Sequence, residues 1–208
     1  MTTAHPNDHS VPASANGGER RSKRDSIVEA ASRLIRTQGV HAASISELIR
    51  ESAASAGTIY HHFASKNDIV LAVAQAAVVG PLEDLLARQR DEVRSPGQLL
   101  IEIVSAVMGG EVESALIVQL WAGSSREPQL QEILRGQMAV VHTGLTHEVE
   151  RWLESQGVPD AAERAVHLAH VTMGQAMGLL AERTILTDLD RDAYLDEAAR
   201  LLDRAANA

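Results

Sequence analysis

Helical periodicity runs through almost the whole chain after residue 24, and it constrains the fold more than any other feature. Apolar residues recur three or four positions apart, and no stretch shows the sustained alternation or the Val, Ile and aromatic enrichment of a strand. We therefore expect an all-α fold. Its 208 residues suffice for a substantial core, arranged as one helical domain or as a small domain joined to a larger one.

The first predicted helix spans residues 24 to 38 or so. One apolar stripe on it consists of Ile27, Ala30, Ala31, Leu34 and Ile35. Gly39 follows the stripe, and glycine favours the left-handed conformation that ends many helices. The first helix is therefore expected to stop there.

Two shorter helices are predicted next. Ser44 and Glu47 have the spacing of a capping box, which indicates a helix start. The pattern breaks near residues 52–55, and Ile59 and Phe63 are the expected core contacts of a third helix. Two short helices with a four-residue break between them predict a helix-turn-helix.

A fourth helix is expected to begin at Ser65, with Asp68 as its capping-box partner. Beyond it, helix breakers divide the chain into six or so further helices. The breakers are Gly80-Pro81, Ser95-Pro96-Gly97, Gly109-Gly110 and the segments 123–128, 157–159 and 187–190. The longest helices are expected at about 129–156 and 161–186, and the last at about 191–205.

Residues 53–66 read Ala-Ala-Ser-Ala-Gly-Thr-Ile-Tyr-His-His-Phe-Ala-Ser-Lys. This segment resembles the DNA-binding domain of the TetR family, which shares a Gly-Thr-hydrophobic-Tyr-x-His-Phe run ending in Ser-Lys. The matching residues are Gly57, Thr58, Ile59, Tyr60, His62, Phe63, Ser65 and Lys66. The resemblance covers about 50 residues, including the first helix. It implies a sequence-specific DNA-binding transcription regulator that is not an enzyme.

Small residues at the start of the third helix would let its backbone approach base edges in the major groove. Glycine in a helix costs about 1 kcal/mol relative to alanine, so Gly57 indicates a steric need. Lys66 and nearby backbone N–H groups can bind a phosphate, whereas His62 can equally well fill the seam between the third and fourth helices. The expected DNA-binding residues are Arg24, Ser44, Ser46, Ser55, Ala56, Gly57, Thr58, Tyr60, His61, His62 and Lys66.

The chain departs from many relatives at Ala53, where they have glycine, and at Ala56, where they have Lys or Arg. The recognition helix therefore carries no Lys or Arg. The net charge is −9, but residues 1–70 hold eight Lys and Arg against seven Asp and Glu, so the acidic excess lies in the rest of the chain. We hypothesise that residues 1–22 form a disordered basic arm, and that the basic cluster at residues 20–24, where this arm meets the first helix, supplements DNA binding, for example in the minor groove.

The resemblance implies a helix-turn-helix domain at 23–70 and a helical effector-binding and dimerisation domain at 71–208. A homodimer would place two recognition helices about 34 Å apart, the spacing of a palindromic site on successive turns of DNA. The expected dimer contacts are Ala169, Met173, Gly174, Ala176, Met177, Gly178 and Leu180. The same periodicity is also that of an internal core.

The resemblance further implies a small-molecule effector that binds among the middle helices. The expected lining residues are Met108, Leu116, Leu120 and Trp121, which are equally plausible as ordinary core. The chain has one Phe and two Trp, which slightly favours an aliphatic or small polar effector over a flat aromatic one. An alternative is a DNA-binding dimer without a ligand, a constitutive or architectural regulator, and a ligand-sized cavity would separate the two.

Composition argues against other classes of protein. There is no cysteine, which excludes disulfides and thiolate chemistry and fits a cytoplasmic location. Charge interrupts the longest apolar stretches within about a dozen residues, fewer than the roughly 20 that span a bilayer, so no membrane association is expected. No Glu-x-x-His pair or nucleophile elbow occurs, no cofactor is expected, and His142, His147, His167 and His170 are not expected to bind metal.

Overall fold

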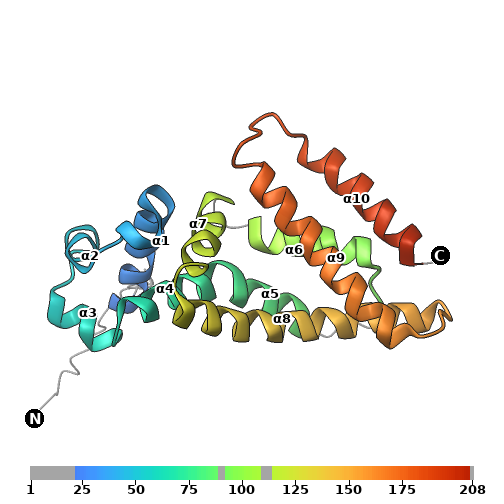
Figure 1. The fold of residues 1–208 in the computed structure, drawn as a ribbon, viewed down its shortest axis with the longest axis horizontal. Helices are drawn as coiled ribbons and strands as arrows, with labels where there is room; N and C mark the ends of the chain where they lie inside the picture. The colour runs from blue at the N-terminus through green and yellow to red at the C-terminus, as the bar shows by residue number, and fades with distance from the viewer. Residues whose placement is uncertain (1–21, 89–91, 109–113, 207–208) are drawn as a thin grey trace, which may run out of the picture.

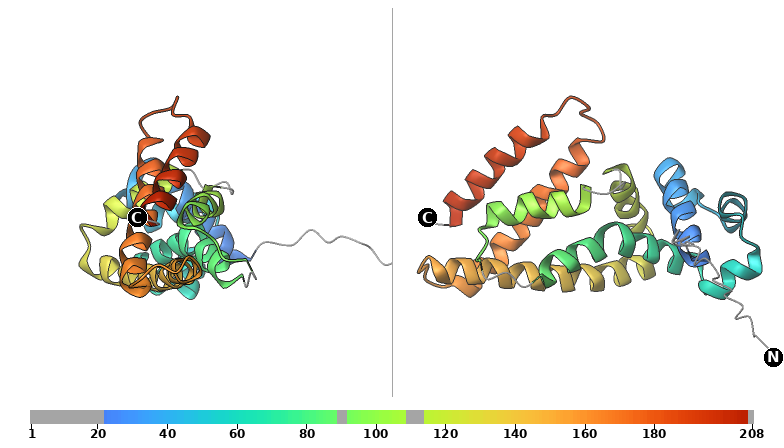
Figure 2. Two further views of the ribbon diagram at one scale, coloured as in Figure 1. Left: turned by 90° about the vertical axis from the view of Figure 1, so that its right-hand side faces the viewer. Right: turned by 180° about the vertical axis from the view of Figure 1, so that it is seen from behind.

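The computed structural model describes residues 22–88, 92–108 and 114–206. All regular structure in these residues is helical, which confirms the predicted all-α fold. Figures 1 and 2 show the first helices gathered at one end of an elongated molecule and the end of the last helix at the other. The predicted basic arm lies outside the described residues, apart from its last residue, Ser22.

The N-terminal end of the molecule is formed by α1 (Lys23–Ala42), α2 (Ile45–Ser52), α3 (Ala56–His62) and α4 (Lys66–Ala74). Both predicted capping boxes are present, one at the start of α2 and one at the start of α4. Gly39 interrupts α1 as expected, with φ +82° and ψ 166°. Its φ is positive, but its ψ lies outside the left-handed helical region, in a conformation that only glycine adopts readily.

The pair Gly80-Pro81 does not end a helix, contrary to the sequence prediction. A π-helical segment, η1 (Gln75–Val79), joins α4 to α5 (Gly80–Ala87), so residues 66–87 form one continuous helix. Proline lacks an N–H and its ring crowds the preceding turn of an α-helix, and the wider π turn accommodates both defects. There the Gly80 N–H donates to the carbonyl of Gln75, five residues back.

The continuous helix at 66–87 is long and apolar enough to cross a membrane by length and composition alone. In an 18-residue window of it, 56% of the residues are buried inside the protein. This burial is what a core helix of a globular domain produces as well.

The remaining helices are α6 (Pro96–Met108), α7 (Ser114–Ser124), α8 (Pro128–Ser155), α9 (Ala161–Glu182) and α10 (Arg191–Ala206). The predicted long helices are thus confirmed to within a few residues at each end. In Figure 1, α8 runs along one edge of the molecule beside α5, α9 crosses back over it, and α10 returns antiparallel to α9. Contacts join α8 to α9 and α5, and α6 to α9 and α10.

The N-terminal helices are attached to the body through α1 and α7. Val40 is buried against α7 at Gly123, where an added Cβ would lie 2.5 Å from the Cβ of Val40. Only glycine permits so close an approach. The domain boundary expected at residue 70 lies within α4, whose far end packs against α7 and α8.

A buried ion network holds the start of α6 to α8. Arg94 is 3% exposed, and its guanidinium lies 2.7 Å from the Glu148 carboxylate and 2.9 Å from that of Glu102. Arg151 also contacts Glu148, at 3.3 Å. Several partners surround each charge here, as burial of a charge requires.

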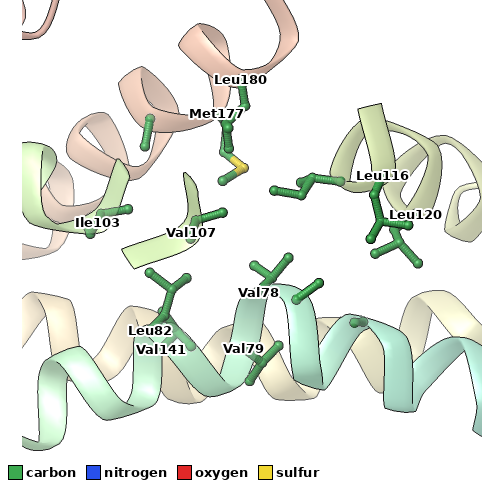
Figure 3. Packing of buried hydrophobic residues seen from close by; sticks show 14 of the residues in the cluster. Val78, Val79, Leu82, Ile103, Val107, Leu116, Leu120, Val141, Met177 and Leu180 are labelled. Atoms are coloured by element: carbon green, nitrogen blue, oxygen red, sulfur yellow. The ribbon is translucent and has the colours of Figure 1, made fainter. Parts of the chain in front are cut away.

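Most of the α9 residues predicted for a dimer interface face the chain's own core. Figure 3 shows Met177 and Leu180 pointing toward the interior that Val107 of α6 and Val78 of η1 also enter. The residues buried in this way are Ala169, Met173, Ala176, Met177 and Leu180. An apolar stripe on a helix can form a dimer contact or part of the internal core. In α9 it belongs to the core, because other helices of the same chain cover it. Gly178 is partly buried, and Gly174 is exposed with no atom within 4 Å of an added Cβ.

Candidate nucleic-acid interface

The outer face of α3 carries small and hydroxyl-bearing residues. Ile59 is fully buried and Phe63, at the C-terminal cap, is 4% exposed, whereas Tyr60 is 56% exposed. The other exposed residues of this face are Ser55, Ala56, Gly57, His61 and His62. The structure thus exposes most of the predicted α3 contacts to solvent. His62 is exposed as well, but it also borders a groove with Arg24 of α1 and Asp68 of α4, so it lies at the seam between α3 and its neighbours.

Gly57 has open space in front of it. An added Cβ there would meet only the Ser55 Oγ, at 3.8 Å. No crowding within the chain therefore requires glycine at this position. A need for glycine would have to come from a molecule that approaches the helix from outside.

Ser55 and Thr58 organise the start of α3. The Thr58 N–H donates to the Ser55 Oγ at 3.1 Å, and the two hydroxyl oxygens lie 2.9 Å apart. Ser55 is thus the N-cap of the helix. Thr58 is only partly buried, which leaves its side chain within reach of a surface partner.

The start of α2 presents Ser44 and Ser46 to solvent. Ser44 receives the Glu47 N–H at 3.2 Å and donates its own N–H to the Glu47 carboxylate at 3.0 Å. Donation to the Glu47 carboxylate from the Ser44 N–H, and from the Ser44 hydroxyl at 3.1 Å, lowers the pKa of Glu47 below its ordinary value. Glu47 stays ionised and closes the first turn of α2.

Two of the cations predicted to bind DNA, Lys66 and Arg24, lie in the described structure. The Lys66 ammonium donates to the carbonyl of His41 at 3.0 Å, which holds the side chain across the end of α1. The Arg24 guanidinium carbon lies 5.2 Å from the centre of the Phe63 ring, a cation–π contact. Both cations are held in place at the edge of the α3 surface.

Ala53, in the turn between α2 and α3, has a left-handed backbone with φ 51° and ψ 26°. This conformation costs an L-residue other than glycine roughly 1–2 kcal/mol. The backbone conformation at this position therefore favours glycine, the residue that many relatives have there. In this chain the alanine is strained.

A pocket of about 360 Å³ lies behind the helix-turn-helix, among the end of α4, η1, α7 and α8. Of the predicted effector contacts, Leu120 and Trp121 line it. Leu116 is buried in the core and is not among the lining residues, and the side chain of Met108 lies outside the described structure. The other lining residues are Ala74, Val78, Val79, Ser124, Gln131, Leu134, Arg135 and Met138.

Sequence reasoning did not find the contributions of η1 and α8 to this pocket. Leu134 and Met138 are four residues apart on α8, as are Gln131 and Arg135, and this spacing alone signals an amphipathic helix. Only the structure marks the site, through the half-exposed Trp121, because a large apolar side chain near solvent often indicates a binding surface.

Comparison with known proteins supports the same domain. Residues 27–73 match the model of the bacterial regulatory proteins, tetR family. The HTH-type transcriptional regulator UidR of Escherichia coli (strain K12) is 27% identical over 181 residues, covering 85% of this chain and 86% of UidR.

Solved structures share the fold over most of the chain. Salmonella enterica GusR superposes with a TM-score of 0.71 at 21% identity, covering 89% of this chain and 96% of GusR. Bacillus subtilis FadR, solved in complex with stearoyl-CoA, gives 0.68 at 16% identity, covering 86% of this chain and 97% of FadR. These TM-scores show that the chain shares the fold of both structures.

The helix-turn-helix, its signature residues and the named relatives agree. They describe a DNA-binding transcriptional regulator and not an enzyme. The helix-turn-helix of this chain is a DNA-binding domain of the TetR family of bacterial regulatory proteins.

Proposed function

We propose that the protein is a homodimeric repressor that binds a palindromic operator and leaves it when a small molecule occupies the pocket beside η1. The observation that carries this proposal is the continuity of the helix at 66–87. Its first turn, at Lys66, belongs to the helix-turn-helix end, and Val78 and Val79 of the same helix line the pocket. A ligand there would contact the element that leads to the DNA-binding surface.

The size and walls of the pocket favour an effector over regulation without a ligand. Its volume of about 360 Å³ lies in the range of small-molecule sites. The relative FadR was solved with stearoyl-CoA, so this architecture accommodates a ligand in at least one neighbour. A constitutive or architectural regulator would have no use for such a cavity.

The DNA-binding residues proposed for the operator are those exposed on α3 and at the start of α2, with Lys66 and Arg24 at the edge. Tyr60 and Gly57 are both exposed on α3. Hydroxyl groups and close backbone approach would read the bases, and the two cations would hold phosphates. A cytoplasmic site of action follows from this role, because bacterial DNA lies there.

The dimer is proposed to use the outer surfaces of α8 and α9. Val140 on α8 is 59% exposed and Val171 on α9 is 48% exposed. An added Cβ at Gly136 of α8 or at Gly174 of α9 would meet nothing within 4 Å. Exposed valines and open glycines let another helix pack closely.

The oligomeric state can be tested by sedimentation equilibrium of Val140→Glu and Val171→Glu. A monomer in either variant, with helix content unchanged by circular dichroism, supports the proposed interface. Leu201→Glu is the matched control, because Leu201 is an equally exposed apolar residue on α10. A wild-type monomer at micromolar concentration contradicts the dimer.

Effector release is tested by first selecting the operator from random DNA with the full-length protein. Compounds are then screened for release of that DNA by fluorescence anisotropy. A wild-type protein that a compound releases, together with an Ala74→Leu variant that folds, binds DNA and resists release, supports the pocket as the effector site. Equal release of both proteins would place the effector elsewhere.

A further inference from the structure

The pocket beside η1 has two chemically different walls. Ala74, Val78 and Val79 form one apolar wall, all of them buried, and Leu120 adds to it from α7. The indole of Trp121 borders the same space and is 43% exposed. An apolar group bound here would remove its own surface and part of the indole from water, which gains about 25 cal/mol for each Å² of apolar surface.

The α8 wall is divided into two rows. Leu134 and Met138, four residues apart, form an apolar row, and Gln131 and Arg135, also four apart, form a polar one. Residues at this spacing lie one above the other on a helix. Ser124 at the end of α7 adds a hydroxyl to the lining. The pocket therefore has an apolar interior and a polar edge.

Arg135 is the sole charged residue among the described residues that line the pocket. Its side chain is 72% exposed and pairs with Glu132, one turn before it on α8 and 67% exposed. Exposed pairs of this kind contribute little, because water screens both charges. The guanidinium is therefore available to a carboxylate, which it can bind through two parallel hydrogen bonds.

From this arrangement we propose that the pocket binds a small amphipathic carboxylate, with its apolar part against η1, α7 and Trp121 and its carboxylate at Arg135 and Gln131. The proposal rests on the proposed function in taking this pocket as the effector site. A volume of about 360 Å³ lies at the lower end of the range of small-molecule sites, which suits a small ligand.

The test uses octanoate as the probe, with octan-1-ol and octylamine as neutral and cationic molecules of the same length. Trp152→Phe leaves Trp121 as the single tryptophan, because the chain has two, and its fluorescence then reports on the pocket. Octanoate is expected to change this fluorescence and to bind at least tenfold more tightly than octanol, with octylamine weakest.

In the same background, Arg135→Gln is expected to weaken octanoate binding at least tenfold and to leave octanol binding within twofold. Arg200→Gln is the matched control, because Arg200 also forms an exposed pair with a glutamate three residues before it, on α10. Octanol binding as tightly as octanoate, no effect of Arg135→Gln, or no fluorescence response to millimolar octanoate would each overturn the proposal.

The outcomes separate this proposal from the proposed function. Octanoate that binds in an Arg135-dependent manner without releasing operator DNA supports the ligand class and contradicts octanoate as an inducer. Release of DNA by another compound, with no octanoate binding, overturns the ligand class and leaves effector-controlled repression intact.

Discussion

At the scale of single residues, the helix-turn-helix combines strong local signals with one strained position. Ser44, Ser55 and Ser65 each receive the N–H expected of a helix cap. These contacts lie within three residues, so sequence alone predicts them well. Ala53 is the exception, because its left-handed backbone is unfavourable for alanine.

Ala53→Gly is expected to raise the free energy of unfolding by about 0.5–1 kcal/mol, because relief of left-handed strain exceeds the entropy that glycine adds to the unfolded chain. Urea denaturation measures this change in the free energy of unfolding. Ala56→Gly, the same substitution in the first turn of α3, should instead destabilise the protein. A loss of stability in Ala53→Gly would show that the left-handed turn is not strained.

Gly57→Ala should separate stability from DNA binding. The added Cβ has open space, so the folded protein should be as stable as the wild type or up to about 1 kcal/mol more stable. Affinity for the selected operator should fall at least tenfold, because the methyl group would hold the helix away from the bases. Unchanged affinity in an anisotropy titration would remove Gly57 from the interface.

At the scale of elements, the π-helical segment distinguishes this chain from a plain succession of α-helices. Gln75 accepts a hydrogen bond from the Gln137 amide of α8 at 3.2 Å and donates to Glu83 of α5 at 3.1 Å. The segment is thus connected on both sides. Gly80 is required because an added Cβ would lie 2.9 Å from the carbonyl oxygen of Gln75.

Gly80→Ala is expected to lower the free energy of unfolding by about 1–3 kcal/mol, since the backbone carbonyl of Gln75 must move to make room. Gly57→Ala on α3 is the opposite case, with open space around the added methyl group, and should be neutral or stabilising in the absence of DNA. Chemical denaturation of both variants tests the pair. Equal effects would show that Gly80 does not maintain the π turn.

The seam between α8 and α9 has a pH-sensitive contact. The rings of His142 and His170 lie 3.7 Å apart, and the His142 Nε2 is buried without a hydrogen-bond partner. Burial, and then repulsion from His170, lowers the pKa of His142 below its ordinary 6.5. The unfolded chain therefore binds this proton more readily than the folded protein does.

Because that pKa is lowered, the stability linked to His142 is fully present above about pH 6.5 and falls as the pH drops below it. The wild type should lose stability as the pH falls from about 6.5 to about 5.5, and His142→Leu should lose less. Thermal unfolding across this range measures the difference. His147→Leu, an exposed histidine on the same helix, should follow the wild type, and identical profiles for all three proteins would contradict the assignment.

At the scale of the whole molecule, the acidic excess is confined to the part of the chain after residue 70. Residues 71–208 contain eleven Lys and Arg against 21 Asp and Glu, whereas residues 1–70 are nearly neutral. Since α3 carries no Lys or Arg, most of the attraction to phosphates has to come from its neighbours. Lys66 and Arg24 supply part of it, and the basic cluster before α1 is the remaining source.

Deleting residues 1–21 should weaken operator binding and flatten its salt dependence, because Arg20 and Arg21 are lost. The deletion keeps Ser22, whose hydroxyl caps α1 by accepting the Asp25 N–H at 3.1 Å. The slope of log affinity against log salt should fall by up to roughly 2. Replacing both arginines by glutamine in the full chain should have the same effect, and an unchanged slope in both proteins would refute the basic-arm hypothesis.

Sequence by itself determined the helical class, the helix-turn-helix with its caps, and the family, because each depends on residues within a few positions of one another. Only the tertiary structure decided the course of the helix through Gly80-Pro81, the burial of the α9 stripe and the walls of the pocket. These depend on which distant helices cover a given face, as α7 and α8 do for η1. Periodicity shows that a helix has an apolar face, but the partner that covers it is a property of the whole fold.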